Sequence, residues 1–192
     1  LKFLTECAKT LRESLETNFI AITGSCGKTS VKDMLGFVLN KYFKTTFSKK
    51  SFNNKYGVPL SIFNTPEQSK FAVLEVGMNK KGEINSLTKL IRPDIGLITN
   101  ISYAHIQNFK NLNQIAEAKG EIINNINPNG TMIINMDDKY YKYFLKKTNQ
   151  NGLKSITFST KKTKADVSFL SQKKNKNNYL LKILKKQQKI VI

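Results

Sequence analysis

FIAITGSCGKTSVKDMLGFVL, residues 19–39, is the stretch of sequence that decides the fold. It opens with the apolar run Phe19–Thr23, which is typical of a short buried strand. Over Lys28–Tyr42 apolar residues then recur at the spacing of one helix face, at Val31, Leu35, Val38 and Leu39. Between strand and helix lies a turn that contains Gly24 and Gly27. A glycine-containing turn from a buried strand into a helix is the setting of a phosphate-binding loop.

The turn also has the residue types that phosphate binding requires. Glycines let backbone N–H groups point inward around phosphate oxygens, and the N-terminus of the helix adds a favourable dipole. Lys28 is placed to reach the β- and γ-phosphates of ATP, and the Thr29 hydroxyl to hold Mg²⁺. The full phosphate-loop pattern has a further glycine where this chain has Ile22, so an ordinary strand-to-helix turn stays open as the alternative. The predicted nucleotide-binding residues are Gly24, Ser25, Cys26, Gly27, Lys28, Thr29 and Ser30.

Strand and helix patterns alternate through the first three quarters of the chain. The further strand candidates are Phe71–Val76, Ile95–Thr99 and Thr131–Asn135, and the further helix candidates are Glu83–Ile91, before Pro93, and Leu112–Ile126. This alternation predicts an α/β fold, namely a three-layer, P-loop-type and mostly parallel sheet with helices on both faces.

The pattern changes near Asn151. Short strand candidates separated by turn-like breaks follow, and they predict a small antiparallel β appendage over residues 151–192. These candidates are Ser155–Phe158, Asp166–Leu170, Tyr179–Ile183 and Ile190–Ile192. We expect residues 1–18 to be the end of a preceding domain or a linker helix, and residues 19–192 to form one ATP-binding domain. Because the chain begins without Met and ends inside an apolar run, we interpret it as a piece of a longer protein.

The hydrophobic content and the cysteines limit the class of protein to which the chain can belong. Hydrophobic residues make up 40% of the chain, which fits a globular domain, and no apolar run approaches the ~18–20 residues that span a bilayer. Cys7 and Cys26 have no zinc-site spacing and form no disulfide framework, so a reducing, cytoplasmic setting is expected.

The net charge of +19 favours nucleic acid or a membrane surface as a partner. The basic residues are nearly all Lys, however, with Arg at Arg12 and Arg92 alone. Planar recognition of bases and phosphates favours Arg, and the chain has no nucleic-acid-binding motif. We therefore expect a solvated Lys-rich surface and no specific nucleic-acid partner. A non-catalytic, Lys-rich nucleotide- or nucleic-acid-binding module stays as the alternative from another class.

Six segments, in one order, resemble the Mur ligase family. Thr23–Ser30 is similar to the shortened phosphate loop of that family. The other segments are Phe52–Pro59, Glu75–Asn79 with Gly82–Ile84, Thr99–Ile101 with Ala104 and His105, Ala118–Ile122, and Asn135–Asp138. The resemblance runs from about Ile20 to Asp138 and is weaker to the end of the chain. Within the family, the segments are most similar to the branch that joins D-alanyl-D-alanine to UDP-N-acetylmuramoyl-tripeptide.

The resemblance implies further metal-site residues. Glu75 lies at the carboxyl end of a predicted strand, where open α/β sheets place ligands, and a carboxylate there suits Mg²⁺. An exposed strand-end Glu is the alternative. His105, the one histidine of the chain, is implied as a ligand of a second Mg²⁺. Lys119 is implied to be carbamylated and to support the same metal. The carbamate forms on the neutral amine, so Lys119 needs a lowered pKa. Lys28, Lys119 and His105 are the expected catalytic residues.

Two asparagines are the expected substrate contacts. The resemblance implies that Asn53 and Asn54 face the nucleotide-sugar substrate. Some family members have Gly-Asn shortly before this pair, where Lys50 and Ser51 stand here. The substrate contacts of this loop therefore depart from the pattern at two positions.

The implied reaction is the formation of an amide driven by ATP, in the synthesis of peptidoglycan precursors. A substrate carboxylate takes the γ-phosphoryl group to give an acyl phosphate, and an amine then displaces the phosphate. The resemblance also implies an N-terminal UDP-binding domain and a C-terminal domain, both expected to be absent from this chain. We therefore expect the chain alone to be inactive, and to be a monomer. A sister Mur ligase or a folylpolyglutamate synthase would share the phosphate loop and stays as the alternative.

Overall fold

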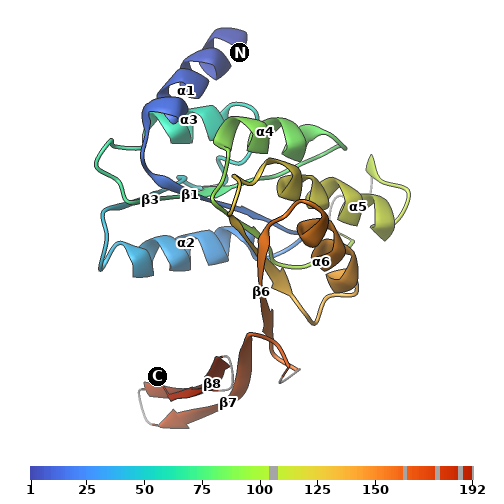
Figure 1. Ribbon diagram of the computed structural model, residues 1–192. Coiled ribbons are helices and arrows are strands. Elements are labelled where there is room, and N and C mark those ends of the chain that lie inside the picture. Colours follow the sequence, from blue (N-terminus) through green and yellow to red (C-terminus); the bar gives the residue numbers. More distant parts are fainter. Residues whose placement is uncertain (104–107, 162–163, 176–177, 186–187, 192) are drawn as a thin grey trace.

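The computed structural model describes residues 1–103, 108–161, 164–175, 178–185 and 188–191. Helices and strands alternate through the first 159 residues, where the strands lie side by side between helices, and the strands that follow extend away from the helices (Figure 1). The helices are α1 Lys2–Ser14, α2 Lys28–Leu39, α3 Gly57–Phe63, α4 Glu83–Ile91, α5 Leu112–Lys119, the 3₁₀ helix η2 Gly120–Asn125 and α6 Tyr141–Gln150. The strands are β1 Asn18–Thr23, β2 Thr45–Phe47, β3 Phe71–Glu75, β4 Ile95–Ile98, β5 Thr131–Asn135, β6 Lys154–Ser159, β7 Val167–Asn175, β8 Asn178–Lys185 and β9 Gln188–Val191.

The described strands form one sheet in the order β2-β3-β1-β4-β5-β6-β7-β8-β9. Each neighbouring pair from β2 to β7 is parallel, whereas β8 runs antiparallel to both β7 and β9. In register, Ile22 of β1 pairs with Glu75 of β3, and Thr23 pairs with Ile98 of β4. The carboxyl ends of three neighbouring strands therefore meet at one edge, which is where a parallel sheet places ligands.

Helices cover both faces of the parallel part, but unequally. On one face, α2 packs Val31, Leu35 and Leu39 against a small cluster of β-strand residues around Ile22 and Val73. The larger core lies on the other face, where α1, α3, α4, α5 and α6 pack together with η2 (Figure 1). The expected α/β architecture, a mostly parallel sheet with helices on both faces, is confirmed.

One strand assignment was wrong. The predicted strand Ser155–Phe158 was placed in an antiparallel appendage, but β6 pairs in parallel with β5 and belongs to the main sheet. Parallel neighbours need a crossover, and α6 supplies it. Helix α6 is not predicted by the sequence pattern because its buried face is narrow, with Phe144 and Thr148 as its buried residues.

The predicted helix Leu112–Ile126 is also not continuous. It is α-helical through Lys119 and then tightens into the 3₁₀ helix η2. Gly120 sits at the junction, where a Cβ would lie 3.3 Å from the rings of both Tyr143 and Phe144 of α6. The close approach of α6 therefore coincides with the change of helix type.

Helix α1 is fixed to the core by one buried cation. The Arg12 guanidinium lies 4.1 Å from the centroid of the Phe19 ring, and it donates to the backbone oxygens of Ile91 at 2.6 Å and Arg92 at 2.9 Å. Residues 1–18 thus pack on the same domain as β1 and α4. No helix among the described residues is long and apolar enough to cross a membrane.

Candidate functional site at the carboxyl edge of the parallel sheet

The phosphate loop joins the end of β1 to the start of α2. Gly24 and Gly27 have φ values of +148° and +80°, which L side chains rarely adopt. A Cβ on Gly24 would also overlap the Thr99 hydroxyl. The first intrahelical bond of α2 runs from the N–H of Val31 to Gly27 O at 3.0 Å, so the N–H groups of the first turn are available at the loop.

The segment after β4 supports this loop from the side. Thr99 Oγ1 donates to Cys26 O at 2.6 Å, Asn100 Oδ1 accepts from the N–H of Cys26 at 3.1 Å, and Ser25 Oγ donates to Ser102 O at 3.0 Å. The Thr99-Asn100 segment is part of the family resemblance, but this supporting role was not predicted. The two strands are neighbours in the sheet but over 70 residues apart in the chain, so only the topology brings them together.

Two predicted catalytic lysines converge on one carbonyl oxygen. Lys28 Nζ lies 3.0 Å from Gly24 O, and Lys119 Nζ lies 2.9 Å from the same atom. Lys119 is 1% exposed. Burial, and then the neighbouring Lys28 cation, lower the pKa of Lys119 to about 7. A large share of Lys119 is therefore the neutral amine near neutral pH, which is the form that reacts with CO₂.

Two predicted metal ligands also lie together. Thr29 Oγ1 donates to Glu75 Oε2 at 2.7 Å, while Asn53 Nδ2 donates to Glu75 Oε1 at 2.7 Å. A hydroxyl and a buried carboxylate at the phosphate loop are hard oxygen donors of the kind that Mg²⁺ takes. Within the described residues no three His, Cys, Asp or Glu side chains gather as a ready metal site. His105, the expected ligand of a second Mg²⁺, lies outside the described residues.

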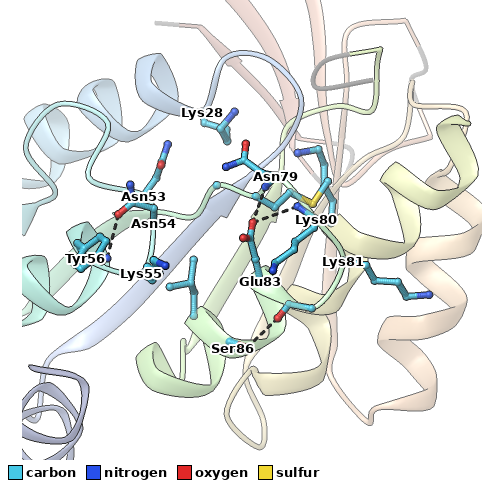
Figure 2. A pocket seen from close by; sticks show the side chains of 15 residues that line it. Lys28, Asn53, Asn54, Lys55, Tyr56, Asn79, Lys80, Lys81, Glu83 and Ser86 are labelled. Carbon is cyan, nitrogen blue, oxygen red and sulfur yellow. Dashed lines mark hydrogen bonds between the residues drawn. The ribbon is translucent and has the colours of Figure 1, made fainter. Parts of the chain in front are cut away.

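A pocket of about 730 Å³ opens beside these groups. Lys28 lines it on one side and Asn53 and Asn54 on another (Figure 2). Lys119, which reaches Gly24 O of the loop, also lines it. Asn54 also has a structural task, because its Oδ1 accepts from the N–H groups of Tyr56 and Gly57 at the start of α3. The remaining wall is the loop between β3 and α4, Gly77–Gly82.

Acidic side chains that the sequence analysis did not single out hold this wall. Glu83 Oε2 accepts from the N–H groups of Asn79 at 2.6 Å and Lys80 at 3.2 Å (Figure 2). Glu121 Oε1 accepts from the N–H of Gly82 at 2.8 Å. Glu121 lies in the Ala118–Ile122 segment, and no periodicity in the sequence indicates its distant partners. Ser30, also expected at the nucleotide, is exposed in the first turn of α2.

The comparisons with known proteins agree with this geometry. Residues 22–192 match the model of the Mur ligase middle domain. The chain is 38% identical over 168 residues to the UDP-N-acetylmuramoyl-tripeptide–D-alanyl-D-alanine ligase of Buchnera aphidicola subsp. Acyrthosiphon pisum, covering 88% of this chain and 36% of that protein.

Solved structures share the fold. MurF from Acinetobacter baumannii superposes with a TM-score of 0.89 at 27% identity, covering 98% of this chain and 41% of that one. MurF ligase from Thermotoga maritima, in complex with ADP, superposes with a TM-score of 0.85 at 22% identity, covering all of this chain and 43% of that one. The chain thus spans about a third of the length of the curated relatives it matches. With a family model matched over residues 22–192, the chain belongs to the Mur ligase family, as its middle domain.

Proposed function

We propose that this chain is the ATP-binding part of a ligase that joins D-alanyl-D-alanine to UDP-N-acetylmuramoyl-tripeptide. The observation that carries the proposal is the convergence of Lys28, Lys119, Thr29 and Glu75 at the phosphate loop, beside a pocket large enough for the end of a peptide substrate. The substrate assignment rests on the names of curated relatives. Relatives from several organisms are 38–43% identical to this chain.

In the proposed reaction, the protein binds the phosphates and the substrates supply the reacting groups. The backbone N–H groups of the loop and Lys28 bind the phosphates and offset their charge as ADP leaves. The substrate carboxylate attacks the γ-phosphorus, and the amine of D-alanyl-D-alanine then attacks the acyl carbon, releasing inorganic phosphate. No protein nucleophile is needed, because positioning and charge neutralisation account for most of the catalysis of phosphoryl transfer.

Thr29 and Glu75 are the residues that would hold Mg²⁺. The ion would neutralise charge between the β- and γ-phosphates and polarise the transferred group. Asn53 orients the Glu75 carboxylate through a 2.7 Å hydrogen bond. Carbamylation would change Lys119 from a cation facing Lys28 into an anion, so that it could support a metal instead of repelling one. We further propose that the chain alone binds nucleotide without turnover, because the relatives named as ligases are about two and a half times as long.

The test is ADP release by a full-length ligase that contains this domain. We expect continuous ADP release, beyond one equivalent per enzyme, only when ATP, UDP-N-acetylmuramoyl-tripeptide and D-alanyl-D-alanine are all present. Lys28→Ala should lower the rate on the order of a hundredfold or more, because it removes a group that stabilises developing charge. Lys70→Ala, which removes an exposed Lys at the far end of β3, is the matched control and should keep the rate. Turnover with a UDP-dipeptide and a single amino acid in place of these substrates would assign the chain to a sister ligase.

A further inference from the structure

The wall of the pocket is held by a side chain from another element. Loop Gly77–Gly82 ends at α4, whose N-cap residue Gly82 has no side chain to cap the helix. Glu121 of η2 supplies the cap from a distance. Its Oε1 accepts from the N–H of Gly82 at 2.8 Å and its Oε2 from the N–H of Asn85 at 3.0 Å. A carboxylate is the favoured partner at a helix N-terminus, and both of its oxygens are used here.

Glu121 stands two residues after Lys119. Lys119 Nζ reaches Gly24 O of the phosphate loop at 2.9 Å, while Glu121 reaches the opposite wall of the pocket. Both residues are buried, at 1% and 8% exposure. One short segment, Lys119–Glu121, therefore contacts the phosphate loop with one side chain and the pocket wall with another.

Further contacts make η2 and α4 a stiff unit. Asn125 Nδ2 donates to Asn85 Oδ1 and to Thr88 Oγ1, each at 3.0 Å. On the loop itself, Glu83 holds the N–H groups of Asn79 and Lys80. Because Glu83 belongs to α4, the loop moves with α4, and the position of α4 against the phosphate loop depends on Glu121.

We propose that Glu121 is a positioning residue that fixes the pocket wall, Gly77–Gly82, at a set distance from the phosphate loop. The inference rests on the proposed function, because that distance aligns the acceptor carboxylate with the γ-phosphate. Displacement of reacting groups by about 1 Å can cost on the order of a hundredfold in rate. Glu121 touches neither nucleotide nor substrate, and it acts through the backbone of Gly82 and Asn85.

The first test separates positioning from general stability by steady-state kinetics on the full-length ligase. Glu121→Ala should raise the KM for UDP-N-acetylmuramoyl-tripeptide about tenfold or more and lower kcat, while the KM for ATP changes by less than about twofold. Glu121→Gln keeps one acceptor oxygen and should be intermediate. The matched control is Glu117→Gln, which alters an exposed 3.1 Å ion pair with Lys81 of the same loop and should leave all three constants unchanged. A variant that merely lost folded enzyme would lower kcat and leave both KM values unchanged.

The second test does not depend on activity. Amide hydrogen exchange at Gly82 and Asn85 should be about tenfold or more faster in Glu121→Ala than in wild type, and unchanged in Glu117→Gln. Unchanged exchange at both amides, equal rises in the two KM values, or loss of folding in both Glu121 variants would overturn the inference. Absence of ADP release by the wild type would instead overturn the proposed function, and the exchange measurement would still decide on the Glu121 contact.

Discussion

At the scale of single residues, the site is built from side chains that constrain each other's charge. Lys28 and Lys119 both donate to Gly24 O, so two ammonium groups share one acceptor in a buried place. Burial and charge repulsion disfavour the charged form of Lys119, which is the more deeply buried of the two. Burial and the Lys28 cation lower its pKa to about 7, whereas an ordinary Lys has a pKa of about 10.4.

The lowered pKa predicts selective carbamylation of Lys119. With a pKa of about 7, roughly half of Lys119 is neutral at pH 7, against less than about one in a thousand for a surface Lys. The neutral fraction rises as pH rises through 7, so at constant CO₂ pressure carbamylation should increase from pH 6 to pH 8. Carbon-13 NMR with labelled CO₂ should show one carbamate signal with this pH dependence, absent in Lys119→Arg. A signal that persists in Lys119→Arg would place the carbamate on another residue.

In the full-length ligase, Lys119→Ala should turn over on the order of a hundredfold more slowly, and a small carboxylate should partly restore the rate.

At the scale of elements, the structure depends on contacts between helices that the sequence pattern treats separately. Helix α1 contributes little apolar burial of its own, with Ala8 and Arg12 as its buried residues. Arg12 nevertheless joins α1 to the last turn of α4 and to the start of β1. Helix α4 carries part of the pocket wall, so this buried cation supports the site from the opposite end of α4.

Arg12→Ala should therefore destabilise the domain. It leaves the buried carbonyl oxygen of Ile91 without the Arg12 donor, whereas Arg92 O keeps a 3.0 Å hydrogen bond from Asn127 Nδ2. It also removes the cation that lies over the Phe19 ring. The expected loss in free energy of unfolding is about 2–4 kcal/mol, by the cost of unpaired buried polar groups. Urea unfolding measures it. Arg92→Lys is the control, because the Arg92 side chain is exposed, and should change stability by less than about 0.5 kcal/mol. An equally small effect for Arg12→Ala would show that α1 is held in another way.

At the scale of the whole molecule, charge is the property that composition makes most prominent. The chain has 32 Lys and Arg residues against 13 Asp and Glu residues. Many of the described Asp and Glu side chains accept hydrogen bonds within the fold, as Glu75, Glu83 and Glu121 do at the site. The Lys excess is spread over the surface and into the pocket, which five Lys residues line. This distribution favours an anionic small-molecule substrate and gives a diffuse positive field outside the pocket.

The diffuse field predicts weak, sequence-independent binding of nucleic acid. Two unrelated DNA duplexes should bind this chain alike at low salt, and binding should weaken steeply as salt rises, because it depends on counterion release. At physiological salt the Kd should be weaker than about 10 µM, within the range of non-specific binding. Fluorescence anisotropy across a salt series measures both features. Tight, sequence-selective binding at physiological salt would favour a nucleic-acid-binding module over a ligase.

The sequence by itself determined the elements whose information is local. The strand–turn–helix at residues 19–39, α4 with its stop before Pro93, and β5 could be predicted because residues a few positions apart define a buried strand, a helix face or a turn. Alternation of such elements was enough for the parallel α/β architecture. Helix α6 could not be predicted because few of its residues are buried. Without this crossover helix, β6 was assigned to the antiparallel appendage instead of the main sheet.

Only the tertiary structure decided which distant residues meet. The parallel order brings β3 and β4 to either side of β1. This placement lets Glu75 form a hydrogen bond with Thr29, and Thr99 with Cys26. The lowered pKa of Lys119 follows from burial and from Lys28, 91 positions away in sequence, and neither can be derived from the residues around Lys119. The Glu121 contact with Gly82 is likewise a product of packing. Local sequence sets backbone preference and hydrophobic period, whereas charge, burial and hydrogen-bond partners at a site depend on elements that the sheet brings together from across the chain.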